Sequence, residues 1–123
     1  MENKKDNAMI LMEEIIQGIE NVKGESIQKM DLRKIENTPF EFFVICSGNS
    51  NTQVSAIVNS IQKNVSKRLH EKPLHTEGLE MSEWVLIDYV NVVVHVFQRK
   101  TRKFYNIEEL WGDAISTQIV SNY

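Results

Sequence analysis

Apolar residues recur every three or four positions in two long segments, which predicts two amphipathic helices. In the first, residues 8–22, the apolar stripe consists of Met9, Leu11, Met12, Ile15, Ile16 and Ile19. In the second, residues 51–70, it consists of Val54, Ile57, Val58, Ile61, Val65 and Leu69. Ser50 and Gln53 have the spacing of a capping box, so we expect the second helix to begin there and to end before Pro73.

Shorter apolar runs predict three strands around these helices. Residues 26–32 alternate imperfectly and are expected to form the first strand. Residues 42–46 follow Pro39 and are apolar at every position, as in a central strand that is covered on both faces. Residues 74–76 are expected to form a short edge strand.

Residues 84–89 and 92–97 predict a β-hairpin. If its loop has two residues, one face carries Val85, Ile87, Tyr89, Val92, Val94 and Val96. The other face then carries Trp84, Leu86, Asp88, Val93, His95 and Phe97. A loop of three residues would change this parity. The first face is a plain core face, whereas the second mixes aromatic rings with a carboxylate and an imidazole.

The hairpin leads into a short helix over residues 102–111, which carries three aromatic residues and a leucine. The order of elements indicates an α+β fold, with a mixed sheet of about five strands packed against helices. A chain of 123 residues is expected to form a single domain over residues 1–123, with flexible tails at 1–7 and 115–123.

Composition and charge restrict the classes of function that fit this chain. The formal net charge is −3, whereas a protein that binds mainly a nucleic-acid backbone usually carries a basic excess. The cluster Arg99–Lys103 is a local exception, expected to be a solvated face or a contact to a phosphate or acidic partner. The first residues lack the apolar core of a signal peptide, and no apolar stretch reaches membrane-spanning length, so we expect a cytoplasmic protein without membrane contact. Cys46 lies in an apolar run and is expected to be a buried thiol.

Few residues in the sequence indicate a catalytic site. The turn Ser47–Asn51 joins a strand to a helix start and could hold a nucleotide phosphate, but no pair of carboxylates follows to hold Mg²⁺. Asp88 and His95 could form an acid–base pair if cross-strand geometry brought them together, or a structural hydrogen bond. No nucleophile can be assigned to them, and the three histidines are too scattered for a metal site. We therefore expect no enzyme activity, no cofactor and no metal.

The aromatic residues at the end of the chain allow two interpretations. Trp84, Tyr105 and Trp111 could each be core residues. Together with Phe97 and Leu110 they exceed what a core of this size needs at one end, and Trp and Tyr often dominate interface energetics. A protein-binding surface is therefore the favoured interpretation.

Several ordered blocks carry a family resemblance that extends over residues 10–114. The blocks are Phe43–Asn51 with Gln53–Val54, Glu77–Gly78, Glu83–Tyr89, Val92–Phe97, Arg102, Phe104–Tyr105, Ile107–Glu108, Leu110–Trp111 and Asp113–Ala114. This set resembles the Iojap-type ribosomal silencing factors, the RsfS family. The sequence departs from the family pattern at Glu41–Phe42, where an Asp-Tyr or Asp-Phe pair is usual, and at Val90–Asn91, where a turn glycine or aspartate is usual.

The resemblance implies a sheet related to the nucleotidyltransferase fold without catalytic carboxylates, often in a homodimer. It implies binding to the large ribosomal subunit through the subunit's protein fourteen on the intersubunit face. Such binding would block joining of the small subunit, repress translation under nutrient limitation and contribute to late large-subunit maturation. Adjacent ribosomal RNA could be contacted through Arg99–Lys103.

By position, the resemblance places the partner-binding surface at Trp84, Asp88, His95, Tyr105, Leu110 and Trp111. The two tryptophans would be desolvated anchors. Asp88 would pair with basic side chains of the ribosomal protein, and Arg102 could instead fix the geometry between hairpin and helix. Two competing functions remain: a nucleotide-dependent enzyme that uses the turn Ser47–Asn51, and an RNA-binding factor that uses Arg99–Lys103.

Overall fold

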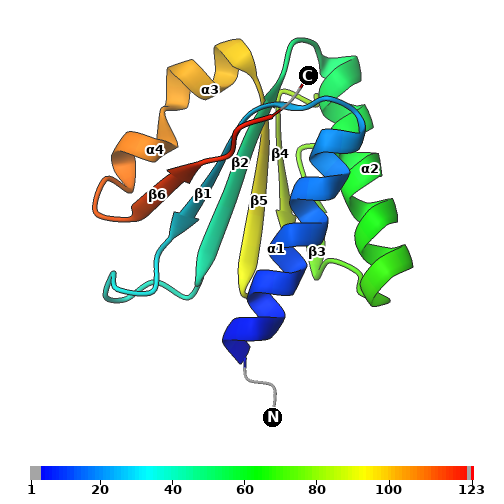
Figure 1. Cartoon of the computed structure of the whole chain (residues 1–123). Helices are drawn as coiled ribbons and strands as arrows, with labels where there is room; N and C mark the ends of the chain where they lie inside the picture. The colour runs from blue at the N-terminus through cyan, green and yellow to red at the C-terminus, as the bar shows by residue number, and fades with distance from the viewer. Residues whose placement is uncertain (1–3, 122) are drawn as a thin grey trace.

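A computed structural model describes residues 4–121 and Tyr123, and it combines one sheet with helices on both faces (Figure 1). The helices are α1 (Lys4–Asn21), α2 (Asn51–Leu69), α3 (Arg99–Tyr105) and α4 (Ile107–Leu110). The strands are β1 (Glu25–Asp31), β2 (Phe42–Gly48), β3 (His75–Glu77), β4 (Trp84–Asp88), β5 (Val92–Gln98) and β6 (Ile115–Gln118). The predicted α+β class with a mixed sheet is confirmed, while the relation to the nucleotidyltransferase fold stays a prediction.

The sheet has the strand order β3-β4-β5-β2-β1-β6 and is one strand wider than predicted. Only β2 and β5 run parallel; the other neighbours are antiparallel. The additional strand β6 pairs with β1 and lies within the segment 115–123, which the sequence predicted to be a flexible tail. Of the other expected tail, residues 1–3 lie outside the described residues, and α1 already begins at Lys4.

Helices α1 and α2 cover one face of the sheet (Figure 1). Their apolar stripes pack on the inner residues of β2, β4 and β5, as the periodicity predicted, except that Met9 of the first stripe is 38% exposed. The two helices cross closely at Gly18, where an added Cβ would lie 2.8 Å from Cα of Ile61. The Ser60 hydroxyl donates to the Gly18 carbonyl at 2.6 Å, so a hydrogen bond adds to the apolar contact.

The start of α2 follows the predicted capping box with one change. The Ser50 hydroxyl accepts the Gln53 backbone N–H at 3.1 Å, as expected for an N-cap. The Gln53 side chain, however, accepts from the backbone N–H of Asn49 at 2.7 Å, one residue earlier than the usual partner. The cap therefore also ties the turn after β2 to the helix.

The hairpin β4–β5 has the register that a two-residue loop predicts. Trp84 pairs with Phe97, Leu86 with His95 and Asp88 with Val93. The residues predicted for the plain core face are all buried under α1 and α2. The residues predicted for the mixed face lie on the opposite side, so both face assignments are confirmed.

The second face of the sheet is covered only in part, by α3, α4 and the loop after β1. Its core consists of Met30, Leu32, Phe43, Ile45, Val93, Phe97 and Ile107, with Trp84, Leu86 and Trp111 packed around them. The single predicted helix 102–111 is broken into α3 and α4 at Asn106, whose φ of 47° places it in the left-handed region. The break turns the chain so that Ile107 is buried while Leu110 is exposed.

Candidate functional site

Trp84 lies at the centre of an aromatic cluster on this second face. Its indole stacks on Phe97 with ring centroids 4.9 Å apart, and Tyr105 of α3 packs against it at 4.9 Å. The indole N–H donates to Nδ1 of His95 at 3.1 Å. Trp84 is half-buried, so one part of the indole is fixed by the fold while another remains accessible.

His95 lies below this surface, with 5% of the residue exposed. Because an indole N–H can only donate, Nδ1 must accept, and the ring is neutral with its proton on Nε2. Burial lowers the pKa of His95 to about 4, which agrees with a neutral ring. The sequence predicted His95 as a contact residue, but in this position it orients Trp84 and presents almost no surface.

Trp111 anchors the end of α4 to the sheet. Its ring meets Phe43 of β2 edge to face, with centroids 5.5 Å apart and an interplanar angle of 85°. Like Trp84 it is half-buried. Of the two interpretations of the tryptophans, the structure therefore supports a mixture: each contributes to the second core and leaves part of its ring accessible.

The most exposed apolar side chains of this face belong to α3 and α4. Leu110 is 78% exposed and Phe104 is 80% exposed, and Tyr105 is also exposed. Phe104 and Tyr105 meet edge to face with centroids 5.0 Å apart. Sequence reasoning selected Tyr105 and Leu110 but missed Phe104, although the pair of adjacent aromatic residues ahead of Asn106 was a usable signal. We call Trp84, Phe104, Tyr105, Leu110 and Trp111 the aromatic surface.

Asp88 lies at the other end of β4 and does not contact His95. Its Oδ1 accepts the backbone N–H of Val90 at 2.7 Å, and its Oδ2 lies 3.6 Å from Nδ1 of His75 on the edge strand β3. The Asp88 side chain is 13% exposed. Both interpretations of Asp88 and His95, an acid–base pair and a structural hydrogen bond, are therefore wrong, because their cross-strand partners are Val93 and Leu86.

Arg102 connects α3 to β1, β2 and α4, whereas the sequence offered it as a link between the hairpin and the helix. Its side chain donates to the Ser26 carbonyl at 2.7 Å, to the Ser47 hydroxyl at 2.8 Å and to Gln28 Oε1 at 3.2 Å. It also forms an ion pair with Glu108 at 2.9 Å. Arg102 thus holds β1, β2, α3 and α4 together and positions the aromatic surface.

The described residues offer little for catalysis. They contain no group of three or more His, Cys, Asp or Glu side chains that could hold a metal ion. The Asp31 carboxylate forms an ion pair with Arg33 at 2.7 Å, and hydrogen bonding to that guanidinium lowers its pKa. Cys46 is buried as predicted, and burial raises the pKa of its thiol to about 12, which leaves it a poor nucleophile.

The described part of the chain contains no membrane-spanning helix. None of its helices combines the length and the apolar composition that crossing a bilayer requires.

Comparisons with known proteins agree with the resemblance stated above. Residues 5–122 match the family model RsfS, "Ribosomal silencing factor during starvation". The ribosomal silencing factor RsfS of Halalkalibacterium halodurans is 37% identical over 109 residues, which cover 89% of this chain and 92% of that protein. A mouse protein named "Mitochondrial assembly of ribosomal large subunit protein 1" is 30% identical over 73 residues, 58% of this chain and 32% of that protein.

Among solved structures, a crystal structure of a Chromobacterium violaceum protein matches with a TM-score of 0.79. The two are 34% identical, and the match covers 92% of each chain. Family model, sequence relatives and fold therefore agree, and the chain belongs to the RsfS family of ribosomal silencing factors.

Proposed function

We propose that this protein silences ribosomes by binding the large ribosomal subunit through the subunit's protein fourteen on the intersubunit face. A bound protein of this size would obstruct joining of the small subunit and so repress translation under nutrient limitation. The observation that carries the proposal is the aromatic surface, which the chain exposes on the second face of the sheet. The described residues include no group that could hold a metal ion, and the family is one of ribosomal silencing factors.

The aromatic surface has the make-up of a protein interface. Large aromatic and aliphatic side chains that lose water on binding supply most of the affinity at such surfaces. Trp84 and Trp111 are already held by His95 and Phe43, so little side-chain entropy is lost when a partner covers them. Phe104 and Leu110 protrude furthest and supply the apolar area to be buried.

Asp88 and the basic segment, which is the cluster Arg99–Lys103, have secondary roles in this proposal. The Asp88 carboxylate is mostly covered and engaged by Val90 and His75, so contact with a basic side chain would replace the weak contact to His75. In the basic segment, Arg99 is paired with Glu25 and Arg102 with Glu108. Contact with adjacent ribosomal RNA would therefore fall mainly to Lys100 and Lys103, both exposed.

The first test is sedimentation of the purified protein with separated ribosomal subunits in a sucrose gradient. The proposal predicts binding to the large subunit alone and a loss of joined ribosomes when both subunits are mixed. Crosslinking of the bound complex should then identify protein fourteen as the neighbour. Binding to neither subunit, or to the small subunit, would reject the proposal.

A matched pair of variants assigns the binding to the aromatic surface. Leu110→Ser should weaken large-subunit binding about tenfold or more, since it removes an apolar contact at an interface. Met81→Ser removes another largely exposed apolar side chain, which lies beside α2 on the opposite side of the sheet, and should leave binding unchanged. Equal effects of both substitutions would show that the aromatic surface is not the docking site.

Three further elements belong to the proposal and have separate readouts. A role in late large-subunit maturation, which the name of the mouse relative suggests for that protein, would appear as immature large subunits in cells that lack this chain. The homodimer that the resemblance implies would appear in sedimentation equilibrium of the free protein. If the protein binds ribosomes as proposed, it is located in the cytoplasm, and cell fractionation can check this.

A further inference from the structure

A polar cavity lies beyond the carboxyl ends of the two parallel strands. Gly48 and Gln98 pair across β2 and β5, so the two strands end at the same level. Beyond them is a cavity of about 440 Å³, lined among others by Ser26, Ser47 and Lys103. This volume is within the range of small-molecule sites, and ligands of open sheets bind beyond the carboxyl ends of parallel strands.

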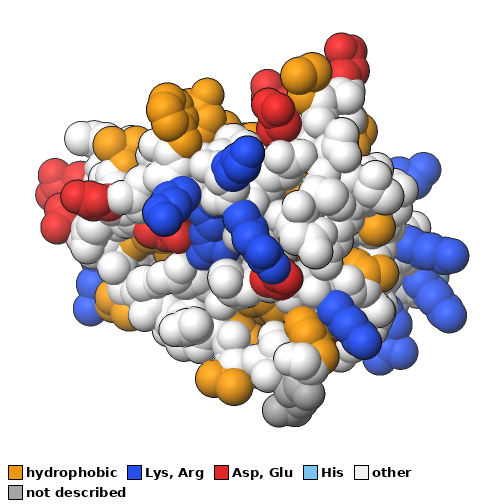
Figure 2. Space-filling view, turned by 90° about the horizontal axis from the view of Figure 1, so that it is seen from above, with side chains coloured by type: hydrophobic (Ala, Val, Ile, Leu, Met, Phe, Trp, Pro, Cys, Tyr) orange, Lys and Arg blue, Asp and Glu red, His pale blue; other side chains and the backbone are white. Residues whose placement is uncertain are grey.

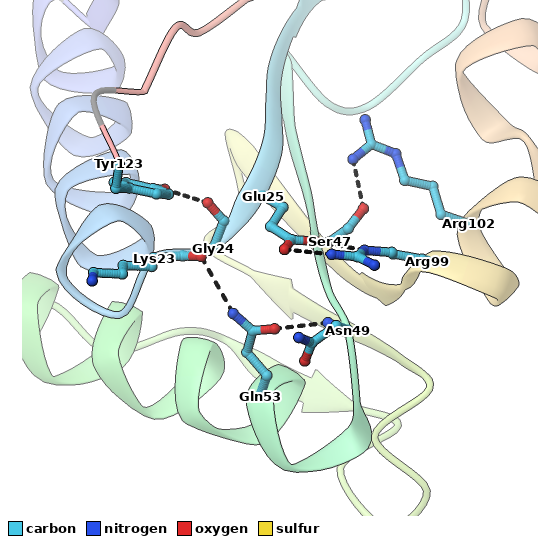
Figure 3. Close-up of polar contacts among 9 residues, drawn as sticks. All are labelled: Lys23, Gly24, Glu25, Ser47, Asn49, Gln53, Arg99, Arg102 and Tyr123. Atoms are coloured by element: carbon cyan, nitrogen blue, oxygen red, sulfur yellow. Dashed lines mark hydrogen bonds and ion pairs between the residues drawn. The ribbon is translucent and has the colours of Figure 1, made fainter.

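One side of the cavity is preformed by Arg102 and an irregularity in β1. The register of β1 against β2 shifts between Glu25 and Gln28, and Ser26 in this bulge has a φ of 50°. The shift directs the Ser26 carbonyl to Arg102. Arg102 also donates to the Ser47 hydroxyl, as Figure 3 shows. Only 11% of the Arg102 side chain is exposed, so its guanidinium is a fixed part of the wall. Bulges and left-handed non-glycine residues often occur beside binding sites.

The charges around the cavity are opposite in sign to that of the whole chain. Arg99, Arg102 and Lys103 line it together with a single acidic residue, Glu108, although the chain as a whole has a net charge of −3. Figure 2 looks onto this end of the molecule and shows Lys and Arg side chains gathered across its middle. The lining therefore has a net positive charge, and such a cavity concentrates anions.

Two of the three cations remain available to a ligand. Four of the five N–H donors of Arg102 are engaged by Glu108, Ser26, Ser47 and Gln28, so Arg102 contributes mainly its field. Lys103 is exposed, and no carboxylate in the described part of the chain lies within ion-pairing distance of it. Arg99 forms an ion pair with Glu25 at 2.6 Å, but most of its side chain is solvent-exposed, so an incoming anion can compete with Glu25 for it (Figure 3).

We propose that this cavity binds a phosphate group, with Lys103 and Arg99 as its direct partners and Arg102 as the fixed charge behind it. The phosphate can belong to a free nucleotide or to the backbone of a single-stranded RNA, because both present the same charged oxygens to the same cations. Binding here involves no covalent step and does not depend on the aromatic surface. It therefore adds a second ligand to the proposed ribosome-binding function, and the two can be tested separately.

The test is calorimetric titration of the full chain, in parallel, with ATP, with pyrophosphate and with a short single-stranded RNA. We expect at least one of the three to bind, with an affinity that decreases as salt increases. Binding of ATP and pyrophosphate identifies a free nucleotide as the source of the phosphate, whereas binding of RNA alone identifies the backbone. Absence of binding by all three at millimolar ligand and low salt would overturn the proposal.

Three single-site variants locate the bound phosphate. Lys103→Ala should weaken binding about tenfold, since it removes a charge-assisted hydrogen bond. Lys67→Ala removes the same charge from an exposed position on α2 that does not line the cavity, and it should change affinity less than about twofold. Glu25→Gln releases Arg99 from its carboxylate and should tighten binding, a direction that mere loss of structure would not produce. Equal effects of the two lysine variants would place the phosphate elsewhere and reject this cavity.

Discussion

The two faces of the sheet are both apolar, but they are covered to very different extents. Helices α1 and α2, of 18 and 19 residues, cover the first face with continuous apolar stripes. Helices α3 and α4, of 7 and 4 residues, cover the second face only in part and leave Phe104 and Leu110 in solvent. The first face therefore supplies stability, while the second combines a small core with exposed apolar side chains that we propose to bind a partner.

The largest expected effect separates the two faces by stability. Ile57→Ala on α2 should lower the free energy of unfolding by about 3 kcal/mol, because Ile57 is fully buried and leaves a cavity. Leu110→Ser should change it by less than about 0.5 kcal/mol, because Leu110 is exposed. Urea unfolding measures both values.

The binding assay should give the reverse order for these two variants. Under conditions in which Ile57→Ala is folded, it should bind the large subunit as tightly as the unmodified protein does. Leu110→Ser should bind more weakly. A large loss of stability in Leu110→Ser would mean that the second face is a closed core, and the contrast between the faces would fail.

His95 provides a pH-dependent measure of how well the second core is sealed. In the unfolded chain its imidazole takes up a proton near its ordinary pKa of 6.5, whereas burial in the folded chain delays protonation to about pH 4. Between these two pH values the unfolded state binds one proton more than the folded state. The contribution of His95 to the free energy of unfolding is therefore fully present above about pH 7 and decreases as the pH falls toward 4. We expect a decrease of roughly 2 to 3 kcal/mol from this residue.

The variant His95→Asn isolates that contribution. Its side-chain oxygen can accept the indole N–H of Trp84 but does not titrate in this range. The difference between the two pH profiles of unfolding free energy cancels the carboxylates, including Glu25 and Asp31, whose pKa values are lowered by hydrogen bonds to Arg99 and Arg33. Parallel profiles would show that His95 is hydrated and that the second core is open to water.

The sequence predicted which face each hairpin residue occupies but not how deeply it is buried. Alternation in β4 and β5 has a period of two, so a correct loop length assigned every side chain from Trp84 to Phe97. The same pattern placed His95 beside Trp84 as an equal candidate for contact. Their difference in exposure depends on Phe43, Tyr105 and Trp111, which come from other elements.

Two local features also escaped the sequence analysis for physical reasons. Strand β6 has four residues, all exposed, and its pairing is decided by the free edge of β1 rather than by its own apolar pattern. The break between α3 and α4 occurs at Asn106 without a glycine or proline to mark it. Asparagine tolerates the left-handed region, but it does so less often than glycine and gives a weaker signal.

The smallest expected effect concerns the turn that keeps the two faces distinct. Val90 has a φ of 78°, and the Asn91 N–H donates to the Tyr89 carbonyl at 3.1 Å, so Val90 is the centre of a three-residue turn that is strained for a β-branched residue. The Val90 side chain is exposed and contributes little packing. Val90→Gly should therefore raise the free energy of unfolding by about 1 kcal/mol, after its greater freedom in the unfolded chain is subtracted.

The matched control is the same substitution two residues later. Val92→Gly should be strongly destabilising, because Val92 is fully buried in the first core. The turn can hold a strained valine because its ends are fixed: Asp88 accepts the Val90 N–H, and the Asn91 carbonyl accepts from Glu41 and Phe42. A loss of stability in Val90→Gly as well would show that the valine is unstrained. The register that separates the two faces would then depend on the strands alone, since a shift of one residue would exchange the faces.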